Sequence, residues 1–342
     1  MKLKKLLLAG SHAATPAYAV AQEIKKRKLS WKIHFIGKKW GMEGENLETL
    51  EYEELPKLGV KFHPLESGKI QTKFTRYTIP ALFKIPFGFI KSLVYLLKIK
   101  PDLTLSFGGA SGALTSFWSF VLSIPVIIHE QTASAGRANI FSARFARKIM
   151  ISRESSKQFF PASKIVLTGN PLNPELSLVL PHTSYVIPHT ILVTGGSRGS
   201  TRINAALEKI LPSLKKKYEV IHLNGKNRLS FSEMAETLLR TDIVVGRAGA
   251  NTVSEIIALK KPSILTPIPW SYKDEQTKNA EFARNFGIAR ILLQAELTPE
   301  RLEREIENLV KDYPNILKRV KNKVSLDLHA SKKVVNILEK YI

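Results

Sequence analysis

The chain of 342 residues contains no cysteine. This absence excludes disulfide bonds, thiolate metal ligands and cysteine nucleophiles, and it is typical of a protein in a reducing compartment. Apolar runs without interruption are also scarce. The uncharged stretch 103–128 is long enough to cross a bilayer, but three glycines, a proline and several hydroxyl residues interrupt it. The stretch therefore predicts a strand, a glycine turn, a helix and a second strand, all buried, and no transmembrane helix.

The chain also lacks a full secretion signal. Residues 1–19 begin with basic residues and end in Ala17-Tyr18-Ala19, which resembles a signal-peptidase site. However, the apolar stretch Leu6–Ala9 is far shorter than the hydrophobic region of a signal peptide, which has about 7–15 residues. We therefore expect that this segment is not cleaved.

Metal-binding patterns are missing as well. No Asp-x-Asp pair occurs, and no second histidine or carboxylate completes a ligand set around His129 and Glu130. Both absences count against a metal-bridged diphosphate and a zinc site. We expect neither a metal nor another cofactor.

The composition indicates a globular protein with a full core, because 44% of the residues are hydrophobic and 24% are charged. Such a chain is too apolar to be disordered, and its length suggests two domains. Lysine and arginine exceed the acidic residues by 23 charges. The surface should therefore attract nucleic acid, anionic lipid or a phosphorylated small molecule.

Short apolar strands alternate with helical patterns in two series, which predicts an α/β fold with parallel sheets. The expected strands of the first series are 5–9, 32–36, 103–107, 126–129, 148–151 and 165–168, and those of the second are 191–194, 218–223, 243–245, 263–266 and 289–292. The fold class is thus α/β with two Rossmann-like domains. Ligands are expected at the carboxyl ends of the strands, in the cleft that the two domains face.

The domain boundaries follow from composition. We expect a first domain over 1–170, a linker over the proline-rich stretch 171–189, and a second domain over 190–324. A charged helix over 299–311 should end before Pro314. The helical pattern from about residue 325 to 342 is expected to pack back on the first domain.

Two glycine turns in the second series are candidate phosphate sites. Residues 195–199 lie between a strand and a helix, where glycines let the backbone approach a phosphate, although an ordinary turn has the same pattern. In the turn after residue 246, Asn251 and Thr252 are good N-cap types, and Glu255 is expected in the first helical turn. Its carboxylate suits a ribose diol. The alternative is a capping box, in which Glu255 bonds only to backbone.

The first series also contains candidate functional groups. His12, in the first glycine turn, is a group that can titrate near neutral pH. His129 and Glu130 end a strand, and a buried structural pair is their alternative. The region 69–100 alternates apolar and basic residues, which suits an anionic membrane surface or, alternatively, a core helix with a solvated basic face.

Taken together, the motifs of the chain resemble the MurG family of N-acetylglucosaminyltransferases, within glycosyltransferase family 28. The resemblance rests on residues 106–112, 124–131, 136 with 139, 168–171, 193–199 with 204, 247–255 and 274–280. They follow the order of the family over nearly the whole chain. The resemblance implies the two-domain GT-B fold and an inverting transfer of N-acetylglucosamine from UDP-N-acetylglucosamine to undecaprenyl-pyrophosphoryl-MurNAc-pentapeptide, without a metal, on the cytoplasmic face of the cell membrane.

The resemblance also implies roles for individual residues of the second domain. The backbone of Phe231 would read the uracil, Glu255 would bind the ribose, and Gln276 would bind sugar hydroxyls. The other donor-site residues that it implies are Ser197, Ala250, Asn251, Thr252, Val253, Ser254 and Asn279.

On the first domain, the resemblance implies that glycine turns bind the lipid diphosphate and that the region 69–100 meets the membrane. The acceptor-site residues are Gly10, Ser11, Gly108, Gly109, Thr132 and Asn139. Asn173, in the expected linker, is a further substrate-binding residue. His12 is the first candidate for the general base, before His129 and Glu130.

The chain departs from the family pattern mainly in its first domain. Its first loop is shorter and has fewer glycines, Thr132 replaces an asparagine, and Asn173 replaces a basic residue. A related transferase with another polyprenyl-linked acceptor, or a non-catalytic module that binds nucleotide sugars, is therefore an alternative. Nucleic acid is the less favoured partner.

Overall fold

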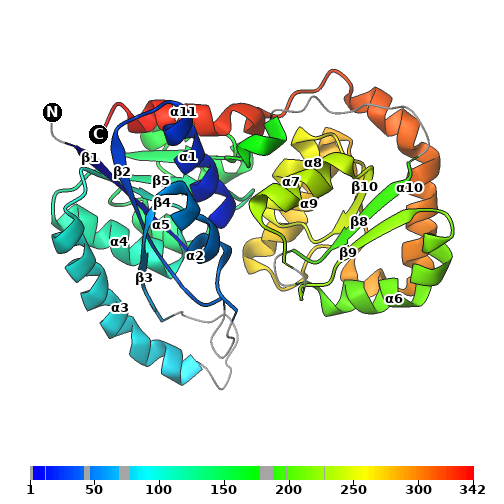
Figure 1. The fold of residues 1–342 in the computed structure, drawn as a ribbon, viewed down its shortest axis with the longest axis horizontal. Coiled ribbons are helices and arrows are strands. Elements are labelled where there is room, and N and C mark those ends of the chain that lie inside the picture. The colour runs from blue at the N-terminus through cyan, green and yellow to red at the C-terminus, as the bar shows by residue number, and fades with distance from the viewer. Residues whose placement is uncertain are drawn as a thin grey trace. The chain divides into compact units, whose positions relative to one another are not determined.

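The computed structural model describes residues 3–11, 13–41, 47–68, 78–177, 188–196, 199–226 and 228–342. It divides into two compact units (Figure 1). Unit 1 comprises Met1–Pro171 together with His329–Ile342, and unit 2 comprises Leu172–Leu328. Each unit is a parallel sheet with helical connections, which confirms the predicted α/β class.

The described part of unit 1 forms a seven-stranded sheet in the order β3-β2-β1-β4-β5-β6-β7. The strands are β1 (Lys4–Ala9), β2 (Trp31–Gly37), β3 (Lys61–Pro64), β4 (Leu103–Ser106), β5 (Val126–Glu130), β6 (Lys148–Ile151) and β7 (Ile165–Leu167), and the helices are α1 (Ala14–Lys26), α2 (Leu50–Glu54), α3 (Thr78–Ile99), α4 (Gly109–Val121), α5 (Arg137–Ser142) and α11 (Ala330–Leu338). The strand order reverses between β1 and β4, which is where such sheets bind ligands.

Unit 2 has a five-stranded sheet in the order β12-β11-β10-β8-β9. The strands are β8 (Thr190–Thr194), β9 (Glu219–Leu223), β10 (Ile243–Gly246), β11 (Ser263–Leu265) and β12 (Ala289–Ile291), and the helices are α6 (Thr201–Lys215), α7 (Phe231–Arg240), α8 (Ala250–Ala258), α9 (Glu275–Phe286) and α10 (Pro299–Val320). Here the order reverses between β8 and β10. The two glycine turns predicted to bind phosphate follow these two strands.

The uncharged stretch 103–128 is β4, a glycine turn, α4 and the start of β5, as its glycines and Pro125 predict. All four residues of β4 and all five of β5 are buried, because helices cover both faces of a parallel sheet. Among the described residues, no helix has both the length and the apolar character needed to cross a membrane.

Two predictions of local structure are wrong. Helix α10 does not end before Pro314 but continues through it to Val320. Its buried face includes Leu309, Tyr313 and Leu317, so the apolar repeat continues past the proline and outweighs the one lost hydrogen bond. The residues 172–176, expected in the linker, include Leu176, which is buried in the core of unit 2.

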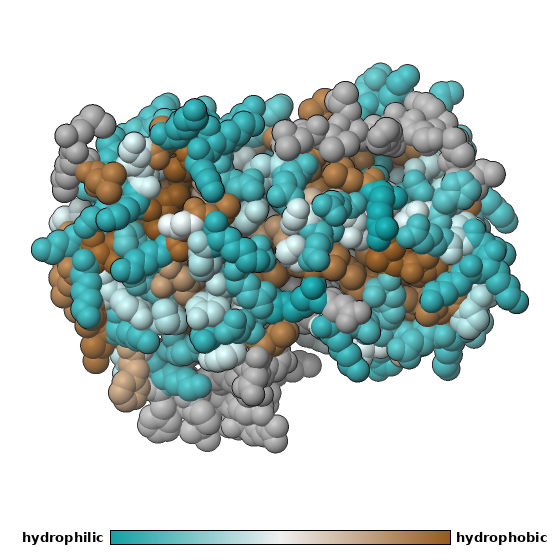
Figure 2. Space-filling view, viewed as in Figure 1, coloured by the Kyte–Doolittle hydropathy of each residue, from teal (hydrophilic) through white to brown (hydrophobic). Residues whose placement is uncertain are grey.

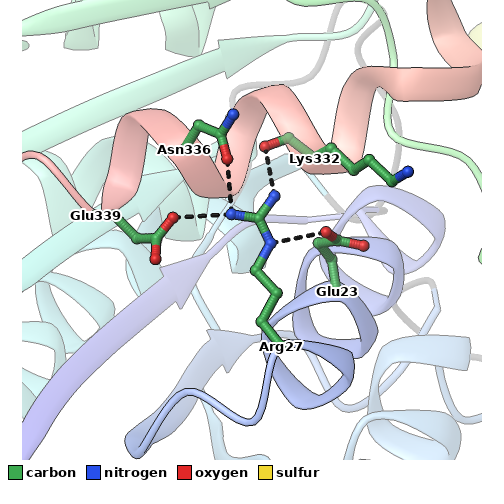
Figure 3. A network of polar contacts seen from close by, with 5 residues as sticks. All are labelled: Glu23, Arg27, Lys332, Asn336 and Glu339. Atoms are coloured by element: carbon green, nitrogen blue, oxygen red, sulfur yellow. Dashed lines mark hydrogen bonds and ion pairs between the residues drawn. The ribbon is translucent and has the colours of Figure 1, made fainter.

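Helix α11 returns the chain to unit 1 and packs on α1. Arg27 joins the two helices (Figure 3). Its guanidinium donates to Asn336 Oδ1 at 2.6 Å, to Glu339 at 2.8 Å and to the carbonyl of Lys332 at 3.0 Å, and it pairs with Glu23 at 2.8 Å. One guanidinium thus serves partners more than 300 positions apart in the chain.

A histidine pair fixes the edge of the sheet of unit 1. His34 Nδ1 lies 2.9 Å from His63 Nε2, and the rings of His63 and Tyr95 of α3 are in contact. Burial, together with His63 and Lys61, lowers the pKa of His34 to about 4. Burial and Lys61 also lower the pKa of His63. The pair is therefore neutral in the folded protein at neutral pH.

This pair should make unit 1 sensitive to acid. Between about pH 6.5 and 4 the unfolded chain binds protons at these histidines that the folded chain does not, so the free energy of unfolding falls as the pH falls. We expect a loss of about 1–3 kcal/mol over this range, measured by urea unfolding. A variant with both histidines changed to glutamine should lose less. An equal loss in that variant would contradict the assignment.

Candidate functional site

The turn after β8 is folded so tightly that it requires glycine. Gly199 has φ +71°, and a Cβ there would lie 2.1 Å from the carbonyl oxygen of Asn224. A Cβ on Gly195 would lie 2.1 Å from the backbone of Gly199. The turn leads into α6, whose N-cap Ser200 accepts from the amide of Ile203. Ser197, predicted to meet the nucleotide, lies outside the described residues.

The turn after β10 is open where the other turn is closed. Gly249 is the N-cap of α8, with φ −65°, and no heavy atom of the described residues lies within 4 Å of a Cβ built there. The helix's own hydrogen bonds begin with the amide of Val253, which donates to the carbonyl of Gly249 at 2.9 Å. The backbone amides of residues 250–252 therefore form the positive end of α8, which suits an anion.

This geometry corrects two expectations. The backbone amide of Val253 was predicted to meet the diphosphate, but the helix uses it, and Val253 and Ser254 are both buried. Glu255 lies in the second turn of α8 and not the first, because the helix begins at Ala250. No side chain caps the helix, so the capping-box alternative for Glu255 is wrong.

Glu255 is the most unusual titratable group of this turn. Its side chain is half-buried, and its carboxyl accepts no hydrogen bond from the described residues. Burial raises the pKa of Glu255 to about 8. A carboxyl that the protein leaves without donors at a helix start is suited to accept hydrogen bonds from a bound diol.

Buried polar side chains hold the turn after β10 in place. Arg247 donates to the carbonyl of Thr266 at 3.1 Å and to Gln294 at 2.7 Å, and its burial lowers the pKa of the guanidinium. Asn279 donates to the carbonyl of Ala248 at 3.1 Å. Asn279 was predicted to bind substrate, but its side chain is buried and supports the turn. No local pattern indicates that Thr266 and Gln294 take part, because they lie 19 and 47 positions from Arg247 in the chain.

Gln276 has a divided role. Its amide oxygen accepts from the backbone amide of Ile268 at 3.1 Å, and its own backbone amide donates to Ser271 Oγ at 3.2 Å. The side-chain amide NH₂ is the part of Gln276 that remains to reach a sugar hydroxyl. Gln276 thus closes the loop between β11 and α9.

Phe231 and Asn173 contact each other across 58 positions of the chain. Asn173 Nδ2 donates to the carbonyl of Phe231 at 2.9 Å, and both side chains are buried in unit 2. Phe231 begins α7, after the capping box of Ser230 and Glu233. Asn173 was predicted to bind substrate and to lie in the linker. It belongs instead to unit 2, where it positions the first residue of α7.

In unit 1, the turns after β1 and β4 meet at the point where the strand order reverses. Gly108 and Gly109 have φ +87° and +71°, and a Cβ on Gly109 would lie 2.5 Å from Ser11 Cβ. The amide of Ser11 donates to the carbonyl of Gly108 at 3.2 Å. A Cβ on Gly10 would lie 2.8 Å from Ala13 Cβ. The structure brings these four predicted residues together, whereas His12 lies outside the described residues.

Hydrogen bonds hold both oxygens of the Glu130 carboxylate. Its Oε1 accepts from the amide of Thr132 at 3.0 Å, and its Oε2 accepts from the amide of Gly136 at 3.0 Å and from Asn139 Nδ2 at 2.9 Å. The hydroxyl of Thr132 lies 2.8 Å from Oε1 and is shared with the carbonyl of Ser134. Since Glu130 is 2% exposed, this geometry favours the structural alternative. Thr132 and Asn139, predicted to bind substrate, serve here to hold Glu130.

His129 is also fully buried, but its ring is not hydrogen-bonded to the carboxylate of Glu130. Its Nε2 lies 3.0 Å from the carbonyl oxygen of Gly169 and 3.4 Å from Thr168 Oγ1. The ring therefore links β5 to the segment after β7. Among the residues that the structure describes, no group of three or more histidine and acidic side chains is placed to hold a metal ion.

Two models of known protein families match most of the chain. A model described as the glycosyltransferase family 28 N-terminal domain matches residues 14–151, and one described as the family 28 C-terminal domain matches residues 190–338. Relatives named UDP-N-acetylglucosamine--N-acetylmuramyl-(pentapeptide) pyrophosphoryl-undecaprenol N-acetylglucosamine transferase are similar at full length. The protein of Geobacter metallireducens is 33% identical over 92% of both chains, and that of Legionella pneumophila is 33% identical over 87% of this chain and 88% of its own.

Solved structures show the same fold. The MurG of Acinetobacter baumannii has a TM-score of 0.69 and 22% identity, covering 98% of this chain and 99% of its own. A UDP-GlcNAc 2-epimerase from Neisseria meningitidis bound to UDP-GlcNAc has a TM-score of 0.67 and 17% identity, covering 98% and 100%. The likeness confirms the fold that the resemblance implies.

Proposed function

This chain belongs to glycosyltransferase family 28, and from that premise we propose that it transfers N-acetylglucosamine from UDP-N-acetylglucosamine to undecaprenyl-pyrophosphoryl-MurNAc-pentapeptide. The observation that carries the proposal is the open start of α8. No described atom lies within 4 Å of a Cβ built on Gly249, and the carboxyl of Glu255, in the second turn of α8, accepts no hydrogen bond from the described residues. A nucleoside diphosphate has the charge and the diol that this arrangement fits.

In the proposed reaction, the acceptor hydroxyl attacks the anomeric carbon of the donor and UDP leaves from the opposite side, with inversion. The leaving diphosphate gains negative charge as the bond breaks. The positive end of α8 and the amides of residues 250–252 stabilise this charge, so the proposed transfer uses no metal.

The acceptor hydroxyl needs a base within hydrogen-bond reach. We propose His12 as the base, because it follows Ser11 in the sequence and Ser11 lies against Gly109. Glu130 is the weaker candidate, since the amides of Thr132 and Gly136 and the side chain of Asn139 already donate to its oxygens. The lipid diphosphate is proposed to lie at the same turn, beside Gly10 and Gly108.

The test is transfer of radiolabelled N-acetylglucosamine to the polyprenyl-linked acceptor in detergent or vesicles. Product formation that depends on both substrates supports the proposal. If the folded protein transferred the sugar only to another polyprenyl-diphosphate sugar, the acceptor would be wrong and the reaction class right. Binding of UDP without turnover on any acceptor would favour the non-catalytic alternative.

We further propose that unit 1 binds the cytoplasmic face of the membrane through α3. This helix exposes Phe87, Ile90 and Leu97, at 75%, 61% and 51%, and the lysines Lys84 and Lys91 are exposed on the same helix. Elsewhere, Figure 2 shows hydrophilic residues over much of the face drawn. An apolar surface with flanking lysines fits anionic lipid.

The membrane proposal predicts that Phe87→Asp with Ile90→Asp lowers binding to anionic vesicles by about 30-fold or more, because two apolar anchors are lost. Sedimentation with vesicles measures this, and soluble UDP binding should not change. Val324→Asp, at a side chain of unit 2 that is 71% exposed, is the matched control. Equal binding of all three proteins would exclude α3 as the membrane contact.

A further inference from the structure

Trp270 is exposed on the loop between β11 and α9, although large aromatic side chains are usually buried. Its exposed fraction is 60%. The neighbouring Tyr272 is half-buried, and Lys273 Nζ lies 5.6 Å from its ring centre. Trp270 is therefore the aromatic group that this loop presents to a ligand.

The loop begins beside the turn that carries the donor site. Strands β10 and β11 are parallel and paired, with Gly246 opposite Leu265, so the segments after them leave the same edge of the sheet. Arg247 bonds the two segments directly, through the carbonyl of Thr266 at 3.1 Å. Trp270 is four residues beyond this bond, on a segment that starts next to the helix of Glu255.

The loop is held at both sides of Trp270. Ile268 donates to the side chain of Gln276, and Ser271 Oγ accepts from the amide of Gln276. Lys273 and Asp274 have φ +51° and +54°, a left-handed backbone that costs energy in residues other than glycine. A loop closed by two bonds and a strained turn displays its exposed indole at low entropic cost for binding.

We propose that Trp270 binds the apolar face of a pyranose ring and so determines sugar specificity in the transfer; this rests on the proposed function. The C–H groups of one face of a pyranose pack on an aromatic ring, while its hydroxyls point outward to polar groups. Gln276, at the start of α9, is bonded to this loop, and its amide NH₂ donates to none of the described residues. The pyranose belongs to the donor or to the acceptor, and kinetics separates the two.

The experiment compares Trp270→Phe, Trp270→Leu and Trp270→Ala with the full-length wild type. We expect Trp270→Phe to keep most of the activity, because an aromatic ring remains. Trp270→Leu and Trp270→Ala should raise the KM of either the donor or the acceptor by about 5–10-fold. A rise in the KM for UDP-N-acetylglucosamine assigns the ring to the donor sugar, and a rise in the acceptor KM assigns it to the acceptor. Val324→Ala is the control for an exposed apolar side chain of unit 2 on another element.

A second measurement does not depend on turnover. Acrylamide should quench the fluorescence of exposed Trp270 in the free protein, and the ligand whose KM changes should protect it, with no such change in Trp270→Phe. If Leu and Ala kept both KM values and kcat of an active wild type, the inference would be overturned while the proposed function stood. If the wild type itself transferred no sugar, the proposed function would fail first.

Discussion

Changing Glu255 to glutamine is expected to weaken UDP-N-acetylglucosamine binding by about 10–100-fold at pH 8.5, because a hydrogen bond to a charged group is worth about 1.5–3 kcal/mol. In the wild type, affinity should rise as the pH rises through the pKa of Glu255, about 8, since the ionised carboxylate is the stronger acceptor. In Glu255→Gln, affinity should not change over this range. Isothermal titration from pH 6.5 to 9 measures both effects.

The same change should stabilise the protein. The pKa of Glu255 is raised by folding, so above its ordinary value of 4.5 the unfolded chain releases a proton that the folded chain keeps. The stability contributed by the protonated form is full below 4.5 and is lost as the pH rises to about 8. We expect the free energy of unfolding of Glu255→Gln to exceed that of the wild type by about 1–3 kcal/mol at pH 9. At pH 4.5 the two free energies should be equal.

Glu236→Gln, on the exposed face of α7, is the matched control. It removes the same charge from unit 2, and we expect neither affinity nor stability to change. A variant at Glu255 that bound the donor as tightly as the wild type at every pH would reject the donor site proposed here.

Gly249→Ala is expected to separate binding from folding. The backbone of Gly249 suits any residue and a Cβ there meets no described atom within 4 Å, so we expect only the loss of about 1 kcal/mol that alanine costs relative to glycine at an N-cap. The added methyl group would stand in the space before the amides of α8. We expect UDP affinity to fall by about 10–100-fold, because the diphosphate cannot approach as closely.

The contrasting variant is Gly199→Ala. Its Cβ would lie 2.1 Å from the carbonyl oxygen of Asn224 at a φ of +71°, so we expect loss of folding of unit 2 and not a specific loss of binding. Thermal unfolding and UDP titration, run on both variants, distinguish the two cases. Normal UDP binding by a folded Gly249→Ala protein would place the diphosphate elsewhere.

The sequence predicted the sheets well, because their signal is local. Strands such as β8 are short apolar runs followed by glycine turns, and each turn lies at the expected strand end. The short edge strand β3 was not predicted, since Lys61 and His63 leave it without an apolar run. The start of α8 was misplaced by two residues because Asn251 and Thr252 are better N-cap types than Gly249.

Site details that depend on tertiary contacts were not accessible from the sequence. The bond from Asn173 to Phe231 joins distant segments, and no local pattern predicts it. The raised pKa of Glu255 results from packing around α8. Glu130 had the residue type of an acid or base, and only the donors around it reveal a structural role.

The return of α11 to unit 1 has a consequence for synthesis on the ribosome. Unit 2 is one continuous segment, so it can complete its core as soon as it has emerged, whereas unit 1 must wait for Val334, Val335 and Leu338, which are fully buried. Until then, the nascent α1 lacks its covering helix and the partners of Arg27. The half of the protein that is translated first is therefore the half that matures last.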